Sequence, residues 1–142
     1  MSPDHPFPRA ALTDCSDALC IFCAGFGGKN AEMVIRDAGI TGLGIDYDAA
    51  LVDAMRDDYP GWSFLVQDAY KAIRSLSRHR FDLVVADPQM NQRDRLLVLY
   101  PTLRRMARHH LVIGVSDHQI PEVKRLGASL SRRTNDSWWA WW

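Results

Sequence analysis

Four short clusters of glycine and acidic residues, each at the end of an apolar run, carry the side chains that could do chemistry. They occupy residues 23–30, 46–48, 67–69 and 87–90. Glycines let a backbone turn sharply and approach a ligand closely, and carboxylates accept hydrogen bonds from hydroxyl and amino groups. If each apolar run is a parallel strand, all four clusters lie at the same sheet edge, where open α/β sheets bind ligands.

The glycine cluster reads Cys23-Ala24-Gly25-Phe26-Gly27-Gly28-Lys29-Asn30 and directly precedes a helix-like stretch. A strand, a glycine turn and a helix together form a cradle for a negatively charged or nucleotide ligand. Because Asn30 follows Lys29, the Gly-Lys-Ser/Thr sequence of a phosphate-binding loop is absent, which disfavours an ATPase or a kinase. A tight turn that binds nothing is the alternative interpretation.

Acidic residues end the next two apolar runs. Asp46 lies 21 residues after Gly25, where a carboxylate can accept hydrogen bonds from both hydroxyls of a ribose. Its alternative role is to cap the following helix, for which Asp48 is better placed. Gln67-Asp68-Ala69 could meet the edge of an adenine ring, and a helix cap at Asp68 is again the alternative.

The fourth cluster, Asp87-Pro88-Gln89-Met90, follows the apolar run at 81–86. An aspartate and the carbonyls of a rigid turn can accept hydrogen bonds from an amino group and so aim its lone pair at an electrophile. The alternative is an ordinary turn, because Pro88 cannot continue a central strand.

The elements that would position these clusters alternate along the chain. Short apolar runs predict buried parallel strands at 19–23, 42–45, 63–66, 81–86 and 111–115. Amphipathic stretches predict helices at 30–38, 48–58, 70–78, 93–110 and 121–126. Pro101 lies inside the longest stretch and predicts a kink or two helices there. We therefore expect an α/β fold with a single open, mostly parallel twisted sheet and helices on both faces.

The two ends of the chain depart from this alternation. Residues 128–133 and 137–142 flank Asn135-Asp136 and predict an antiparallel hairpin at one edge of the sheet. Three prolines in residues 1–17 predict an irregular N-terminal arm, which leaves residues 18–142 as the folded domain.

Taken together, the clusters resemble the motifs of class I S-adenosylmethionine-dependent methyltransferases over residues 18–142. Residues 22–28 are similar to the first motif of that family, and their Ala-Gly-Phe-Gly-Gly part is similar to that of cytosine-5 DNA methyltransferases. Asp46 matches the ribose-binding acid and Asp68 the acid beside adenine. Residues 87–90 resemble the Asp-Pro-Pro-aromatic motif of amino-group methyltransferases.

The resemblance implies a Rossmann-like sheet of order 3-2-1-4-5-7-6 with strand seven antiparallel, and S-adenosylmethionine as cofactor. It implies catalytic roles for Asp87 and Pro88. The implied cofactor-binding residues are Cys23, Ala24, Gly25, Phe26, Gly27, Asp46, Tyr47, Gln67, Asp68, Ala69 and Asp87. The function that follows is methyl transfer to an exocyclic amino nitrogen of a nucleic acid.

Four positions depart from the family pattern. The family usually has an acid at the place of Ile21 and a glycine at that of Cys23, and Gln89 and Met90 replace the second proline and the aromatic residue. An aromatic side chain there normally stacks on a flipped base. Two alternatives therefore stay open: a small-molecule or protein methyltransferase, and a binding module with this fold that has lost its chemistry. A covalent cysteine mechanism is disfavoured, because all three cysteines precede residue 24.

Composition agrees with one cytoplasmic domain. The chain has 142 residues, of which 47% are hydrophobic and 24% charged, as in soluble globular proteins. No apolar run approaches the length of a membrane span, and residues 1–17 lack the order of a signal peptide. Three cysteines form neither a disulfide framework nor a zinc site, and the histidines show no paired spacing, so we expect no metal.

Charge and aromatic residues suggest partners. Residues 1–70 have 4 Lys/Arg and 11 Asp/Glu, whereas residues 71–142 have 13 and 6, so the second half could bind a nucleic acid. Alternatively, the two halves neutralise one another, or the arginines pair with acids of a second subunit. The sequence Trp138-Trp139-Ala140-Trp141-Trp142 predicts a strand with one aromatic face in the core and the other at a homo-oligomer interface.

Overall fold

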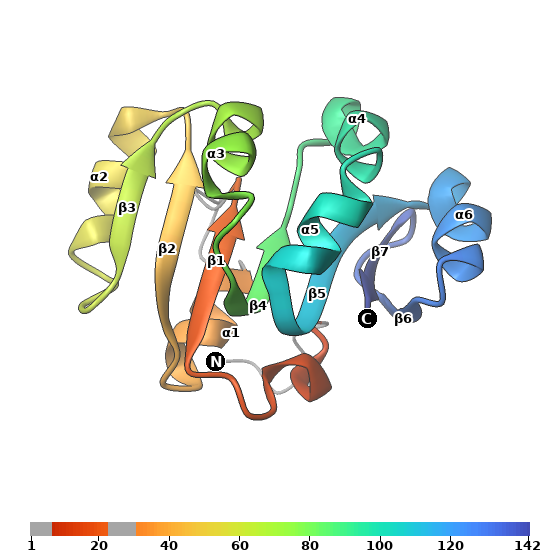
Figure 1. The fold of residues 1–142 in the computed structure, drawn as a ribbon, viewed down its shortest axis with the longest axis horizontal. Coiled ribbons are helices and arrows are strands. Elements are labelled where there is room, and N and C mark those ends of the chain that lie inside the picture. Colours follow the sequence, from red (N-terminus) through yellow and green to blue (C-terminus); the bar gives the residue numbers. More distant parts are fainter. Residues whose placement is uncertain (1–6, 23–30) are drawn as a thin grey trace.

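Seven strands form one open sheet of order β3-β2-β1-β4-β5-β7-β6 in the computed structural model, which describes residues 7–22 and 31–142 (Figure 1). The strands are β1 Asp17–Ile21, β2 Thr41–Asp46, β3 Ser63–Val66, β4 Phe81–Ala86, β5 Ala107–Ser116, β6 Ser129–Arg132 and β7 Ser137–Trp141. Neighbouring strands are parallel except β7, which is antiparallel to both β5 and β6. The predicted order and the predicted C-terminal hairpin are confirmed.

Helices cover both faces of the sheet. They are α1 Ala31–Asp37, α2 Ala49–Arg56, α3 Ala69–Leu76, α4 Arg93–Leu97, α5 Tyr100–Met106 and α6 Ile120–Arg125, with 3-10 turns η1 Arg9–Leu12, η2 Met90–Gln92 and η3 Asp117–Gln119. One core packs α3 to α6 against the sheet, and a second packs η1, α1 and α2 against the other face (Figure 1). Both faces are therefore buried, as the continuous apolar strands predict. No helix among the described residues is long and apolar enough to cross a membrane.

The segment 93–110 differs from its prediction at one end. Two helices form, one of the two predicted alternatives, and Pro101 lies in the first turn of α5, where its missing N–H leaves no hydrogen bond unmade. The predicted helix was too long, however, because β5 begins at Ala107 and pairs with Phe81 of β4. Pairing with a neighbouring strand outweighs the local helical preference of residues 107–110.

Both faces of β7 pack inside the chain. Trp139 is fully buried and its ring meets that of Phe7 edge-on at 5.4 Å, while Trp141 packs in the same core. On the opposite face, Trp138, Ala140 and Trp142 join the core beneath α4 to α6. No tryptophan belongs to the large, well-exposed hydrophobic side chains of the described residues, so this packing gives no support to an aromatic subunit interface.

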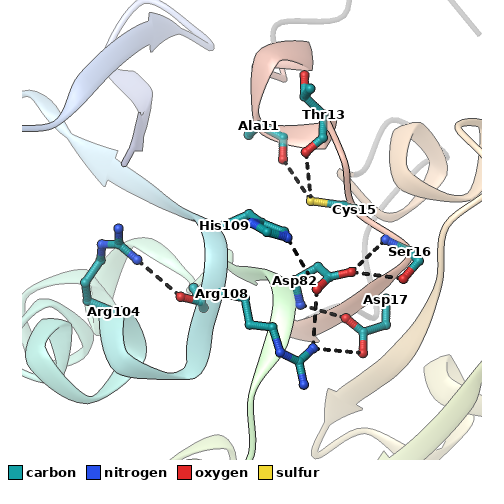
Figure 2. A network of polar contacts seen from close by, with 10 residues as sticks. Ala11, Thr13, Cys15, Ser16, Asp17, Asp82, Arg104, Arg108 and His109 are labelled. Carbon is teal, nitrogen blue, oxygen red and sulfur yellow. Dashed lines mark hydrogen bonds and ion pairs between the residues drawn. The ribbon is translucent and has the colours of Figure 1, made fainter.

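At the amino ends of β1, β4 and β5, a polar network centres on Asp82 (Figure 2). Its carboxylate accepts hydrogen bonds of 2.9 Å from both the backbone N–H and the hydroxyl of Ser16. It also forms an ion pair of 3.3 Å with Arg108. Asp17 accepts from the Asp82 N–H and lies 3.8 Å from Arg108. The hydrogen bonds from Ser16, stronger together than the opposing burial, lower the pKa of Asp82 from 3.8 to about 2.

Asp82→Asn should destabilise the fold in a pH-dependent way. A carboxylate whose pKa is lower in the folded state stabilises above its unfolded pKa near 4, and this contribution disappears as the pH falls toward 2. We expect the variant to lose about 1.5–3 kcal/mol at pH 6, on the scale of hydrogen bonds to charged groups. Urea unfolding at pH 6 and pH 2.5 measures this. Asp53→Asn, at an exposed ion pair, is the control; equal losses at both pH values would contradict the assignment.

Candidate functional site

The carboxyl edge of the sheet holds a topological switch point beside β1. The chain runs from β1 to β2 on one side, and β4 adds to the other side of β1. Open α/β sheets bind ligands in the crevice expected at such a point, outside the carboxyl ends of the strands. Phe22, the first residue after β1, has a φ of +60° and donates its N–H to the Ile45 carbonyl at 2.8 Å. Such a conformation is costly for a bulky side chain and marks this turn as constrained.

Five predicted cofactor-binding residues lie in the glycine cluster outside the described residues: Cys23, Ala24, Gly25, Phe26 and Gly27. The remaining predicted site residues lie at the carboxyl ends of β2, β3 and β4. They are Asp46, Tyr47, Gln67, Asp68, Ala69, Asp87 and Pro88.

Two acids after β2 have different tasks. Asp46 is 8% exposed, and its Oδ1 accepts the Asp48 N–H at 3.0 Å. Asp48 in turn caps α2 by accepting the N–H groups of Ala50 and Leu51 at 3.0 and 3.2 Å. Asp48 therefore serves the helix, and the ribose role of Asp46 stays a prediction. Tyr47 between them is exposed.

The third cluster stands at the end of the edge strand β3. Gln67 donates its N–H to the Asp46 carbonyl at 2.9 Å, which ties this turn to the one after β2. Asp68 caps α3, because its Oδ2 accepts the Lys71 N–H at 3.0 Å. The helix-cap interpretation of Asp68 is therefore correct. Its cofactor role stays a prediction.

Asp87 is held by an arginine from the C-terminal hairpin. Its N–H donates to the Ile21 carbonyl at 3.1 Å, which joins the turn after β4 to the end of β1. Arg133, directly after β6, donates from both terminal nitrogens to the two carboxylate oxygens, Nη2 to Oδ2 at 2.9 Å. The guanidinium also lies 4.2 Å from the ring centre of Trp139. A bidentate pair stacked on an aromatic ring is a rigid arrangement. Pro88 behind it is buried.

Gly114 in β5 makes room for this pair. A Cβ at this position would lie 2.8 Å from Asp87 Oδ1 and 3.3 Å from Arg133 Nη1. Any larger residue would therefore push the carboxylate or the guanidinium away. The glycine is a requirement of the site rather than of a turn.

A second arginine is buried behind the first. Arg93 is 8% exposed, and its Nη1 donates to the Ser116 hydroxyl at 2.8 Å, while its Nε has no hydrogen-bond partner within residues 7–22 and 31–142. Burial lowers its pKa, and the charge of Asp87 opposes that shift. The carboxyl edge near β4 and β5 thus has two guanidinium groups close to one carboxylate, and negative ligand groups are favoured there.

Glu32, in the first turn of α1, is a buried acid that faces the same edge. It is 2% exposed, and its Oε2 has no hydrogen-bond partner among the described residues. Its pKa is raised from 4.5 to about 8, chiefly by burial and to a smaller extent by the charges of Asp87 and Asp46, against the lowering effects of a backbone hydrogen bond and of Arg133. At neutral pH, Glu32 is therefore mostly protonated and can donate a hydrogen bond.

Sequence reasoning missed Glu32, Gly114 and the burial of Arg93, and it counted Arg133 only as surface charge. Glu32 had a detectable signal, because it shares a helix face with the apolar Ile35 three residues on. Arg93 and Arg133 had none, since their partners lie 23 and 46 residues away and depend on the order of the strands.

Glu32→Gln should change how stability depends on pH. The unfolded glutamate ionises near pH 4.5, whereas the folded one keeps its proton to about pH 8, so the wild type loses stability as the pH rises between these values. A neutral glutamine does not. We expect the variant to gain stability relative to wild type from pH 5 to pH 8 in urea unfolding. Glu122→Gln, which alters the other glutamate at an exposed site, should run parallel to wild type. Parallel curves for Glu32→Gln would contradict the assignment.

Comparison with known proteins supports the fold. No protein-family model and no curated protein matches the sequence. Among solved structures, an rRNA methylase from Streptococcus thermophilus has a TM-score of 0.64 at 11% identity, over 99% of this chain and 97% of that one. The N-methyltransferase NodS from Bradyrhizobium japonicum has 0.62 at 16%, over 94% and 89%.

A TehB-like S-adenosylmethionine-dependent methyltransferase from Corynebacterium glutamicum has a TM-score of 0.54 at 19% identity, over 89% of this chain and 78% of that one. Identities this low establish the architecture and nothing more specific. This chain has the fold of class I S-adenosylmethionine-dependent methyltransferases.

Proposed function

We propose that the protein is an S-adenosylmethionine-dependent methyltransferase that modifies an exocyclic amino nitrogen of a nucleic acid. The observation that carries the proposal is the placement of Asp46 and Asp87 at the ends of β2 and β4, on either side of the switch point beside β1. Those positions suit a ribose and an acceptor group, respectively.

The described residues fit the cofactor. Asp46 is a largely buried carboxylate beside the crevice, which suits the two hydroxyls of a ribose. Gln67 lies next to it, because its N–H donates to the Asp46 carbonyl, and Ala69 begins α3. An adenine would lie beside these two residues. Bound S-adenosylmethionine would supply an activated methyl group and a neutral thioether as leaving group.

Asp87 would orient the acceptor rather than remove its proton. Arg133 donates to both oxygens of the carboxylate, and each oxygen keeps a lone pair for an N–H group. An amino group held this way would point its lone pair toward the crevice. Positioning of this kind supplies a large share of the rate in a transfer that needs no strong base.

A nucleic-acid acceptor is supported by charge and by analogy. Arg93 supplies a buried positive charge near the Asp87–Arg133 pair, at the acceptor end. The similar structures include an rRNA methylase, although they also include a spermidine synthase. The bidentate hold of Arg133 on Asp87 also favours a second candidate, a module that binds the cofactor without turnover.

Two measurements separate these functions. Titration calorimetry with S-adenosylmethionine and S-adenosylhomocysteine tests the cofactor site. Transfer of tritium from labelled S-adenosylmethionine to total RNA, to DNA and to a pool of small amines tests the acceptor. Binding without transfer to any of the three would favour the module, and the absence of binding would overturn the proposal.

Asp46→Ala should weaken S-adenosylmethionine by about 1.5–3 kcal/mol, because a charge-assisted pair of hydrogen bonds to the ribose is lost. Calorimetry measures the change. Asp48→Ser removes a charge two residues away but keeps a helix-capping side chain, so it should bind as wild type does. An unchanged dissociation constant for a folded Asp46→Ala protein would remove Asp46 from the site.

Asp87→Asn should lower turnover far more than cofactor affinity. The amide keeps the shape of the side chain but presents one acceptor oxygen instead of two, so the acceptor amine loses its alignment. We expect a rate loss on the order of 100-fold at saturating cofactor, with a dissociation constant within a few-fold of wild type. Asp94→Asn, at an exposed acid, is the control. Normal methylation by Asp87→Asn would leave Asp87 a structural role only.

A further inference from the structure

A groove separate from the crevice lies between α3 and the pair α4–α5. Its volume is about 510 Å³, and its polar lining comes from both sides. The polar lining residues are Tyr70, Arg74, Ser77, Arg95, Thr102 and Arg105, and the rest of the wall is apolar. Figure 1 shows α3 and α5 next to one another on the same face of the sheet. The groove thus combines three guanidinium groups with an apolar floor.

No carboxylate lines the groove. The acids of the flanking helices have other partners: Asp68 caps α3, and Asp94 accepts hydrogen bonds from His118 at 2.8 Å and Gln119 at 3.0 Å. Across residues 7–22 and 31–142, no ion pair involves Arg74, Arg95 or Arg105. Three positive charges at one groove without a counter-charge favour a ligand with several negative groups.

One of these arginines is already positioned. The Arg95 guanidinium lies 3.8 Å from the ring centre of Tyr70, which is a cation–π contact. The Tyr70 hydroxyl donates to Gln92 Oε1 at 3.0 Å, and Gln92 ends the short turn that follows Asp87 and Pro88. These contacts link Arg95, on the α4 side of the groove, to the segment that contains Asp87.

Neighbouring arginines in the sequence have different tasks. Arg104 donates to the Ala107 carbonyl at 3.3 Å, and Arg108 pairs with Asp17 and Asp82 at the opposite edge of the sheet. The basic second half of the chain is therefore not one uniform surface. Only part of it faces a cavity.

We propose that this groove binds successive phosphates of a single-stranded nucleic acid whose target base enters the crevice at Asp87. The inference rests on the proposed function and names where its substrate is held. Guanidinium groups would contact the phosphates, the hydroxyl of Thr102 would donate to them, and the apolar wall would take sugar and base faces.

The test uses a fluorescently labelled single-stranded RNA and a DNA of the same sequence, with binding followed by anisotropy from 50 to 200 mM salt. We compare wild type with the triple variant Arg74→Gln, Arg95→Gln, Arg105→Gln. If each arginine contacts one phosphate, the slope of log affinity against log salt falls by about 2. Affinity at 50 mM should fall at least tenfold. A triple lysine variant at the same positions should keep most of the slope.

The matched control is the triple variant Arg80→Gln, Arg104→Gln, Arg125→Gln, which removes the same charge outside the groove. Its slope should stay near that of wild type. An equal loss in both triple variants, or an unchanged slope in the groove variant, would overturn the inference. So would competition by inorganic pyrophosphate at the affinity of the oligonucleotide, which would make the groove a small-anion site.

Calorimetry with S-adenosylmethionine on the same proteins separates this inference from the proposed function. The groove variant should bind the cofactor as wild type does, because Asp46 and Asp87 are untouched. Salt-dependent binding through the groove by a protein that binds no cofactor would support the groove and overturn the methyltransferase. Cofactor binding by a protein whose groove does not bind the oligonucleotide would support the methyltransferase and overturn the groove.

Discussion

The bidentate pair between Asp87 and Arg133 is the contact on which the carboxyl edge of the sheet depends. It joins the turn after β4 to the C-terminal hairpin, and it fits only because Gly114 in β5 has no side chain. Trp139 supplies the surface on which the guanidinium lies. A partly buried charge pair of this kind contributes little net stability, but loss of one partner leaves the other charge uncompensated. Asp87, Arg133, Gly114 and Trp139 therefore depend on one another.

Charge is sorted between the two ends of the strands. At the amino ends, Asp82 is fully ionised and gathers Ser16 and Arg108, which fastens the start of β1 to β4 and β5. At the carboxyl ends, Glu32 is buried, its Oε2 has no hydrogen-bond partner among the described residues, and it keeps its proton. A satisfied polar network thus fastens the amino ends, whereas an acid with a raised pKa lies at the carboxyl ends, beside the proposed site. This is the pattern expected of a functional edge.

The strands, the order of the helices and the two helix-capping acids were predictable, because they follow from local patterns of apolar and capping residues. The sheet order came from resemblance, since periodicity cannot order strands. The predicted C-terminal end of the helix before β5 was wrong, because the cross-strand pairing of Ala107 with Phe81 is not a local property of the sequence. The surroundings of Asp87 could not be predicted for the same reason: Gly114 becomes its neighbour when β5 pairs with β4, and Arg133 does so when β7 inserts between β5 and β6.

That insertion has a consequence for how the protein is made. β7 is the last strand in sequence, yet it occupies an interior place in the sheet, between β5 and β6. While the ribosome is still adding residues, β5 has an open edge, Phe7 lacks the indole of Trp139, and Arg133 has no ring to lie on. Strand edges and apolar surface exposed in this way invite aggregation. Until residues 137–141 emerge, the nascent chain therefore depends on a chaperone or another segment that shields β5.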